Sequence, residues 1–155
     1  MEHKRPDISI VVPCYNEEES LPLFLRELER VAEQMRQTDD LTFEVVLIDD
    51  GSTDGTLATM KREAQRLPAH FTVRWASFSR NFGKEAALYA GLSHATGELV
   101  ATMDADMQDP PSLLPEMYRI ITTEDVDNVA TRRTTREGEP PIRSLFARMF
   151  YKLIN

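Results

Sequence analysis

Short apolar runs rich in β-branched residues alternate with longer amphipathic stretches, and this alternation constrains the fold more than any other feature. Predicted strands cover residues 8–12, 43–48, 71–78, 98–103 and, more weakly, 126–130. Predicted helices cover residues 21–35, 57–66, 84–95 and 110–121. Because strands and helices alternate without a hairpin signal, the pattern predicts an α/β fold. Its mostly parallel, Rossmann-like sheet would carry helices on both faces.

Length and composition place the chain among single-domain globular proteins. It has 155 residues, of which 41% are hydrophobic and 28% charged. The single cysteine, Cys14, excludes an internal disulfide and is predicted to be a small buried residue at a strand end. Neither a signal peptide nor an apolar run of about 20 residues is visible, so the chain as given is expected to be soluble.

The charge is unevenly distributed between residues 1–131 and residues 132–155. The tail holds six basic and two acidic residues, which makes it +4 within a chain of net charge −8 and leaves the body at −12. Such a tail is expected to meet an anion, and a phosphate or a membrane surface fits better than nucleic acid, which the acidic body would repel. Residues 131–141 are predicted to form a loop that leads into this tail. Residues 142–154 form a basic amphipathic helix that either lies on a membrane or packs in a core.

Polar clusters follow four of the predicted strands, at residues 15–17, 49–52, 80–84 and 104–109. In an open parallel sheet the carboxyl ends of the strands share one edge, and ligands bind there. Any one of these loops could simply contain the polar residues that are common in turns. The four together predict a site that gathers acids, amides and a lysine.

The acidic cluster after the fourth strand predicts a divalent metal. In an extended chain Asp104, Asp106 and Gln108 would point the same way, and hard oxygen ligands suit Mg²⁺ or Mn²⁺. The competing interpretation, helix capping, suits Asp109 before the two prolines better than it suits Asp104 or Asp106.

The other strand ends carry weaker signals. A carboxylate at Asp49 or Asp50 could accept the imide N–H of a uracil ring, whereas Ser52, Thr53 and Asp54 are expected to cap the next helix. Tyr15 could stack on a base or simply pack. Lys84 opposes the dipole at a helix N-terminus, which an anionic ligand or the nearby Glu85 would relieve.

Several site classes are not supported by the sequence. The phosphate loop G-x-G-x-x-G is missing after the first strand, which counts against a dehydrogenase. The acidic loop 13–18 disfavours a nucleotidyltransferase, which would need a glycine-rich basic loop there. No arrangement resembles a Ser/His/Asp triad, a zinc site or a P-loop.

Residues 10–18, 49–56, 79–85 and 103–111 together resemble family 2 glycosyltransferases of the GT-A fold, and the resemblance runs from about residue 8 to residue 155. The most similar subgroup transfers sugars to polyprenyl phosphates, as dolichyl-phosphate mannose synthase and bactoprenol glucosyltransferase do. The resemblance implies metal-dependent, inverting transfer of a hexose from a nucleotide sugar, UDP-linked rather than GDP-linked, to a lipid phosphate. It also implies a parent protein at the cytoplasmic face of the plasma membrane, working on envelope glycans.

The resemblance also assigns roles to individual residues. Nucleotide binding falls to Pro13, Tyr15, Glu17, Asp49, Asp50, Asn81, Gly83, Lys84 and Ala105. Asp104 and Asp106 match the D-x-D metal motif and are assigned a catalytic role. Gln108 matches a third metal ligand. Arg132, Arg133 and Arg136 match an acceptor loop whose arginines bind phosphate, and residues 142–155 match the interface helix after it.

The resemblance therefore divides the chain into a nucleotide-sugar-binding core at residues 1–131 and an acceptor segment at residues 132–155. Family members continue with further catalytic sequence and usually two transmembrane helices, so the chain is expected to be a fragment. The alternative function is a module that binds nucleotide and metal without turnover. Self-association stays open.

Overall fold

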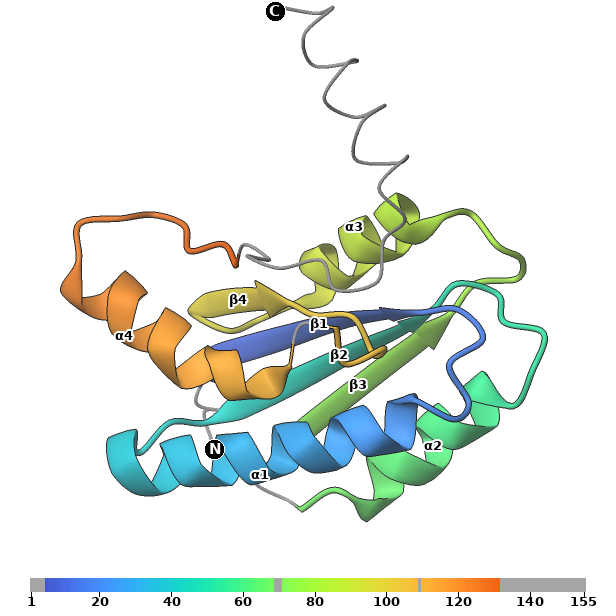
Figure 1. Ribbon diagram of the computed structural model, residues 1–155. Coiled ribbons are helices and arrows are strands. Elements are labelled where there is room, and N and C mark those ends of the chain that lie inside the picture. The colour runs from blue at the N-terminus through green and yellow to red at the C-terminus, as the bar shows by residue number, and fades with distance from the viewer. Residues whose placement is uncertain (1–4, 69–70, 109, 132–155) are drawn as a thin grey trace, which may run out of the picture.

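The computed structural model describes residues 5–68, 71–108 and 110–131, which form a parallel four-stranded sheet with helices on both faces (Figure 1). The strands are β1 (Ile8–Cys14), β2 (Phe43–Asp49), β3 (Phe71–Ser77) and β4 (Leu99–Thr102). Their order across the sheet is β3-β2-β1-β4, and each neighbouring pair is parallel. The predicted α/β class and parallel sheet are therefore confirmed.

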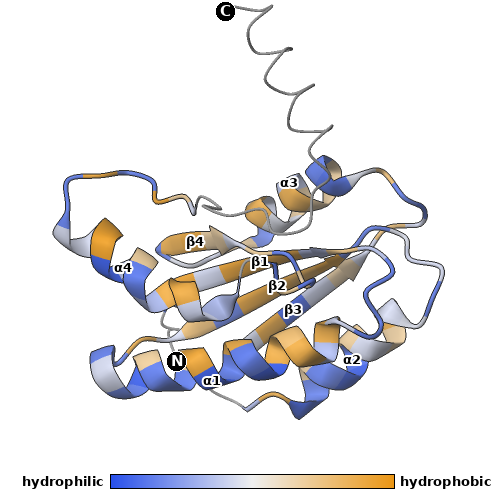
Figure 2. Cartoon of the chain, viewed as in Figure 1, coloured by the Kyte–Doolittle hydropathy of each residue, from blue (hydrophilic) through white to orange (hydrophobic). Residues whose placement is uncertain are grey.

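Helices cover the sheet unequally. α1 (Leu21–Asp39) and α2 (Thr56–Arg66) lie on one face with the short helix η1 (Pro111–Leu113) and α4 (Leu114–Thr123), whereas α3 (Lys84–His94) packs on the other face against β1 and β2. The apolar stripe of α1 that the three- and four-residue spacing indicates is fully buried, and Figure 2 shows the hydrophilic remainder of this helix facing outward. No helix in the described part of the chain is long and apolar enough to cross a membrane.

The two faces of β1 and β2 separate the core into two clusters. Ile10, Val12 and Val45 point toward α1, whereas Val11 and Val46 point toward α3. This alternation makes both strands apolar on both sides, which is why they appear in the sequence as continuous hydrophobic runs.

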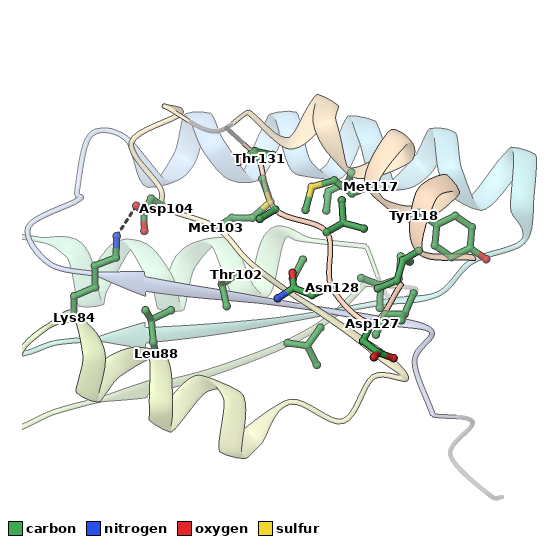
Figure 3. A pocket seen from close by; sticks show the side chains of 18 residues that line it. Lys84, Leu88, Thr102, Met103, Asp104, Met117, Tyr118, Asp127, Asn128 and Thr131 are labelled. Atoms are coloured by element: carbon green, nitrogen blue, oxygen red, sulfur yellow. Dashed lines mark hydrogen bonds and ion pairs between the residues drawn. The ribbon is translucent and has the colours of Figure 1, made fainter. Parts of the chain in front are cut away.

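The predicted fifth strand at Val126–Ala130 is wrong, because the chain after α4 runs as irregular backbone. Asp127 and Asn128 interrupt the short apolar pattern, are exposed, and belong to residue types that strands disfavour. The segment instead borders a cleft of about 650 Å³ between β4 and α4 (Figure 3).

The strand order places a topological switch point between β1 and β4. The chain passes from β1 outward to β2 and β3, then returns to add β4 on the other side of β1. The helix that follows β1, α1, and the helix that precedes β4, α3, lie on opposite faces, and a crevice opens beyond the carboxyl ends of these two strands. All four predicted polar loops lie at this edge.

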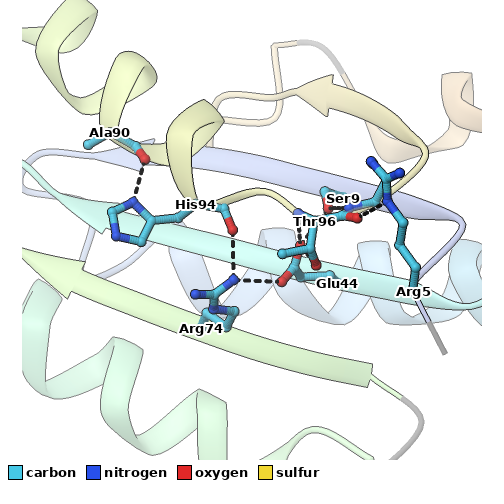
Figure 4. A network of polar contacts seen from close by, with 8 residues as sticks. Arg5, Ser9, Glu44, Arg74, Ala90, His94 and Thr96 are labelled. Atoms are coloured by element: carbon cyan, nitrogen blue, oxygen red, sulfur yellow. Dashed lines mark hydrogen bonds and ion pairs between the residues drawn. The ribbon is translucent and has the colours of Figure 1, made fainter. Parts of the chain in front are cut away.

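A buried carboxylate ties the opposite end of the sheet together (Figure 4). Glu44 on β2 is 1% exposed. Its Oε2 accepts from the hydroxyl of Ser9 at 2.5 Å and from the backbone N–H of Thr96 at 2.9 Å, and its Oε1 accepts from Arg74 at 3.3 Å. Arg74 also donates to the carbonyl of His94 at 2.7 Å, at the end of α3. Glu44 thus joins three strands to the turn between α3 and β4.

We expect Glu44→Gln to lower the free energy of unfolding by about 1–3 kcal/mol near pH 7, because an amide takes away the charged partner of Arg74 and cannot accept every bond. Burial alone would raise the pKa of Glu44, but the hydrogen bonds from Ser9, Thr96 and Arg74 outweigh it and lower the pKa. The carboxylate therefore stabilises the fold above its unfolded pKa of about 4.3, and this stabilisation is lost as pH falls through the lower folded pKa.

Urea denaturation of both proteins at several pH values measures this difference, which should shrink below about pH 4. Glu27→Gln is the matched control, since Glu27 also pairs with an arginine, Arg30, but on the exposed surface of α1. A Glu44→Gln protein as stable as Glu27→Gln at pH 7 would contradict the structural role of the network.

Candidate functional site

A cleft of about 350 Å³ opens at the carboxyl edge of the sheet, at the switch point between β1 and β4. The loops after all four strands contribute to it. Its lining consists of Pro13, Cys14, Tyr15, Glu17, Asp50, Asn81, Gly83, Lys84, Ala87, Asp104, Ala105 and Asp106. Of the nucleotide-binding and metal residues predicted from the sequence, Asp49 and Gln108 alone are missing from this lining.

The loop after β1 is joined to the loop after β2 by a series of side-chain bonds to backbone. Asn16 adopts a left-handed conformation, φ 56°, and its Oδ1 accepts the N–H of Thr53 at 2.9 Å. The hydroxyl of Ser52 accepts the N–H of Asn16 at 3.0 Å, and the hydroxyl of Thr56 accepts the N–H of Glu17 at 2.8 Å. The prediction that Ser52 and Thr53 cap α2 is therefore wrong: they hold the first loop against the second.

Asp49 and Asp50 diverge at the end of β2, because neighbouring residues of a strand point to opposite sides. Asp49 is buried, where its carboxylate accepts from the N–H of Ser52 at 3.0 Å and from the hydroxyl of Ser77 at 2.7 Å. It supports the turn and does not line the cleft, and its role in nucleotide binding stays a prediction.

Asp50 faces the cleft and organises the loop after β3. Its two oxygens accept the backbone N–H groups of Phe82 at 2.7 Å and Gly83 at 3.0 Å. The sequence suggested a base-binding carboxylate at this position and gave no sign of these bonds. Each oxygen keeps a second lone pair, so Asp50 can hold the loop and still accept from a ligand.

Gly51 lets the loops after β2 and β3 approach each other. It has φ +69°, and a Cβ added there would lie 2.3 Å from the carbonyl carbon of Arg80 and 2.6 Å from the nitrogen of Asn81. Both contacts are with backbone, which cannot rotate away. Only glycine permits this approach.

Lys84, the first residue of α3, forms an ion pair across the cleft with Asp104 (Figure 3). Asp104 lies two residues after the end of β4. Lys84 Nζ lies 2.6 Å from Asp104 Oδ2, and the two side chains are 55% and 36% exposed. The sequence predicted that an anion or Glu85 would offset the lysine at this helix end. The structure supplies Asp104.

The chain turns after Asp104, so the expected extended arrangement of the acidic cluster is wrong. Met107 is left-handed, φ 62°, and the N–H of Gln108 donates to Asp106 Oδ1 at 2.9 Å. The turn keeps Asp104 and Asp106 at the cleft but leaves Gln108 exposed and outside its lining. The role of Gln108 as a metal ligand stays a prediction.

The cleft is strongly acidic. Among the described residues, Glu17, Asp50, Asp104 and Asp106 line it with four carboxylates, against the single ammonium of Lys84. The thiol of Cys14 adds no nucleophile, because burial, together with the nearby carboxylates of Glu17, Asp49 and Asp104, raises its pKa strongly. A bound anion would need a further cation in this cleft.

Comparison with known proteins identifies the family. The model of the family described as "Glycosyl transferase family 2" matches residues 9–154, nearly the whole chain. The chain belongs to glycosyl transferase family 2.

Relatives of this family 2 chain include the undecaprenyl-phosphate 4-deoxy-4-formamido-L-arabinose transferase of Sodalis glossinidius. The two sequences are 38% identical over 148 residues, which make up 96% of this chain and 42% of the relative. The chain therefore spans about two fifths of the length of that relative.

Solved structures of glycosyltransferases share the fold of this family 2 chain. The mannosyltransferase PcManGT from Pyrobaculum calidifontis, in complex with GDP-Man and Mn²⁺, has a TM-score of 0.52 and 38% identity over 67% of this chain and 28% of its own. S. aureus TarS 1-349, in complex with UDP, has a TM-score of 0.58 and covers 84% of this chain and 39% of its own. At 21% identity it supports the fold alone. These neighbours confirm the predicted GT-A architecture.

The donor atoms of the family 2 cleft fit a divalent cation. Asp104 and Asp106 offer carboxylate oxygens, which Mg²⁺ and Mn²⁺ prefer. Within residues 5–68, 71–108 and 110–131, no group of three or more His, Cys, Asp or Glu side chains could hold a metal ion. The protein would thus supply a partial ligand set that phosphate oxygens complete. The predicted acceptor arginines, Arg132, Arg133 and Arg136, lie outside the described residues.

Proposed function

We propose that the cleft binds a nucleoside diphosphate sugar together with Mg²⁺ or Mn²⁺, and that the parent protein transfers the sugar to a polyprenyl phosphate. One observation carries the proposal: four carboxylates and a single ammonium line the cleft among the described residues. Such a site repels a free diphosphate but accepts one that arrives with a divalent cation. The solved mannosyltransferase with GDP-Man and Mn²⁺ supports this proposal, as do the relatives named undecaprenyl-phosphate transferases.

Each loop would then have a task. Tyr15, 46% exposed beside Pro13, offers a ring against which a base can stack, and Asp50 holds the loop that carries Asn81 and Gly83. Asp104 and Asp106 would hold the metal ion, which supplies positive charge to stabilise the departing diphosphate. Lys84 can approach the same phosphates from the α3 N-terminus.

Transfer to the acceptor requires few catalytic groups from the cleft. A lipid phosphate is already anionic, so it can attack the sugar carbon directly and invert it without a strong general base. Arg132, Arg133 and Arg136 would bind this phosphate, and residues 142–155 would bring the protein to the membrane surface, on its cytoplasmic side. The sugar stays open between the hexose that the resemblance implies and the arabinose derivative in the name of the relative.

A melting experiment on the chain with UDP and GDP, each with and without Mn²⁺, tests the donor half of the proposal. At a ligand concentration of 100 times Kd we expect the melting temperature to rise by roughly 5–10 °C, and only when nucleotide and Mn²⁺ are both present. UDP should act at lower concentration than GDP. An equal rise in EDTA would contradict metal-dependent binding, and no rise with either nucleotide would contradict the donor site.

Turnover is the second measurement, because a chain two fifths as long as its relative could bind without transferring. Transfer of labelled sugar to a short polyprenyl phosphate, by this chain and by the full-length protein, separates the two functions. Binding by both with transfer by the longer protein alone would identify this chain as a donor-binding module.

A further inference from the structure

We propose that Lys84 is an exchangeable counter-ion: it neutralises Asp104 while the cleft is empty and moves to the diphosphate when metal and nucleotide bind. This inference rests on the proposed function, since it concerns how the same cleft is filled. Its basis is the 2.6 Å contact between Lys84 Nζ and Asp104 Oδ2. A metal ion held by Asp104 would need that carboxylate, so the ion and the ammonium compete for it.

The pair is weak enough to be exchanged. Both side chains are substantially exposed, 55% for Lys84 and 36% for Asp104. Exposed ion pairs stabilise proteins by at most about 1 kcal/mol, which a divalent cation coordinated by two carboxylates readily exceeds. The contact therefore weakens metal binding without preventing it.

The position of Lys84 favours the move. It begins α3, where the helix dipole opposes an ammonium and favours an anion. In the empty cleft Asp104 offsets this unfavourable placement. Once a metal takes Asp104, the ion repels the ammonium, and a diphosphate on the metal offers new oxygens. The four-carbon side chain of lysine can reorient between these two partners while the backbone stays in place.

The exchange makes metal and nucleotide binding cooperative. Metal alone must displace Lys84 and leave its ammonium without a partner, whereas metal with nucleotide releases Lys84 to a new one. By linkage, each ligand then raises the affinity for the other by the same factor. Removing the ammonium should therefore strengthen binding of metal alone, weaken binding of nucleotide at saturating metal, and reduce the coupling factor.

Lys84→Met, which keeps the length and apolar stem of the side chain, tests the inference by Mn²⁺ titration followed by electron paramagnetic resonance. Without nucleotide, we expect the variant to bind Mn²⁺ about fivefold more tightly, the factor that corresponds to an ion pair of about 1 kcal/mol. In calorimetry at saturating Mn²⁺, its affinity for UDP should fall about tenfold, in the range of a charge-assisted phosphate contact. Thermal unfolding establishes that the variant folds.

Lys61→Met is the matched control. Lys61 lies over the ring of Trp75 at 5.1 Å, on the α2 side of the sheet, and does not line the cleft. Lys61→Met removes one positive charge, as Lys84→Met does, and the affinities for Mn²⁺ and for UDP should both stay at the wild-type values.

Unchanged Mn²⁺ affinity in Lys84→Met overturns the competition for Asp104. Tighter Mn²⁺ binding with unchanged UDP affinity overturns the movement of Lys84 to the diphosphate. It would mean that Lys84 only repels the metal ion. If the wild-type chain binds UDP equally with and without Mn²⁺, the proposed function fails first, and the inference falls with it.

Discussion

We expect the double substitution Asp104→Asn/Asp106→Asn to abolish Mn²⁺-dependent nucleotide binding. Asparagine keeps the shape of each side chain but loses the charge that a hard divalent cation requires. Both residues line the cleft, and no third acidic, histidine or cysteine ligand in the described part of the chain completes a metal cluster with them. The affinity for UDP in the presence of Mn²⁺ should fall at least about 100-fold, or about 2.7 kcal/mol, by calorimetry.

The same variant makes an opposite prediction in EDTA. Among the described residues the wild-type cleft sets four carboxylates against one ammonium, and the double substitution leaves Glu17 and Asp50 against Lys84. Repulsion of a free diphosphate should weaken, and Lys84, released from Asp104, becomes available to it. Metal-free affinity for UDP should therefore stay the same or rise. A general loss of folding would instead lower binding under both conditions.

Asp39→Asn/Asp40→Asn serves as the control, because it removes two charges from the exposed end of α1, outside the cleft. Asp40 has φ 54°, a left-handed conformation that asparagine also tolerates. This control should keep the full Mn²⁺ effect. If it loses the effect as well, net charge rather than coordination governs binding; if the cleft variant keeps the effect, the metal lies elsewhere.

The sequence predicted the sheet and the site because both depend on local patterns. Continuous apolar runs locate β1 and β2, and the polar residues that stop them must lie at one edge once the strands are parallel. The meeting of Tyr15, Asn81 and Asp104 at one cleft follows from that topology without any knowledge of side-chain positions.

Details that depend on register and on loop packing could not be predicted from the sequence. Lys84 and Asp104 meet because the N-terminus of α3 reaches the carboxyl end of β4, which no local pattern encodes. Asp49 and Asp50 are adjacent and chemically identical, yet only the exact end of β2 decides which one faces the cleft. Gln108 leaves the expected alternation because Met107 turns the chain.

Gly51 is the glycine that we expect the cleft to tolerate least when changed. In Gly51→Ala the new methyl group would lie 2.3 Å from the backbone carbon of Arg80, and the residue would have to keep φ +69°. The left-handed conformation costs an L-residue about 1–2 kcal/mol, and overpacking against backbone adds about 1–3 kcal/mol. The free energy of unfolding should fall by about 2 kcal/mol or more, as denaturant titration measures.

Gly51→Ala should weaken nucleotide binding as well as destabilise the fold. The displaced segment carries Asn81 and Gly83 into the cleft, and its backbone N–H groups at Phe82 and Gly83 donate to Asp50, the residue before Gly51. Nucleotide affinity in Mn²⁺ should therefore fall even under conditions where the variant is fully folded.

Gly55→Ala separates this effect from the general loss of a glycine. Gly55 lies four residues further along the same loop, with φ −79°, and an added methyl group there would come closest to the carboxylate of Glu18, which can swing away. It should lower stability by less than about 1 kcal/mol, within the range of a lost hydrogen bond, and leave nucleotide affinity unchanged. Because the two substitutions are chemically identical, equal effects would mean that the close approach of the loops after β2 and β3 does not hold the cleft in shape.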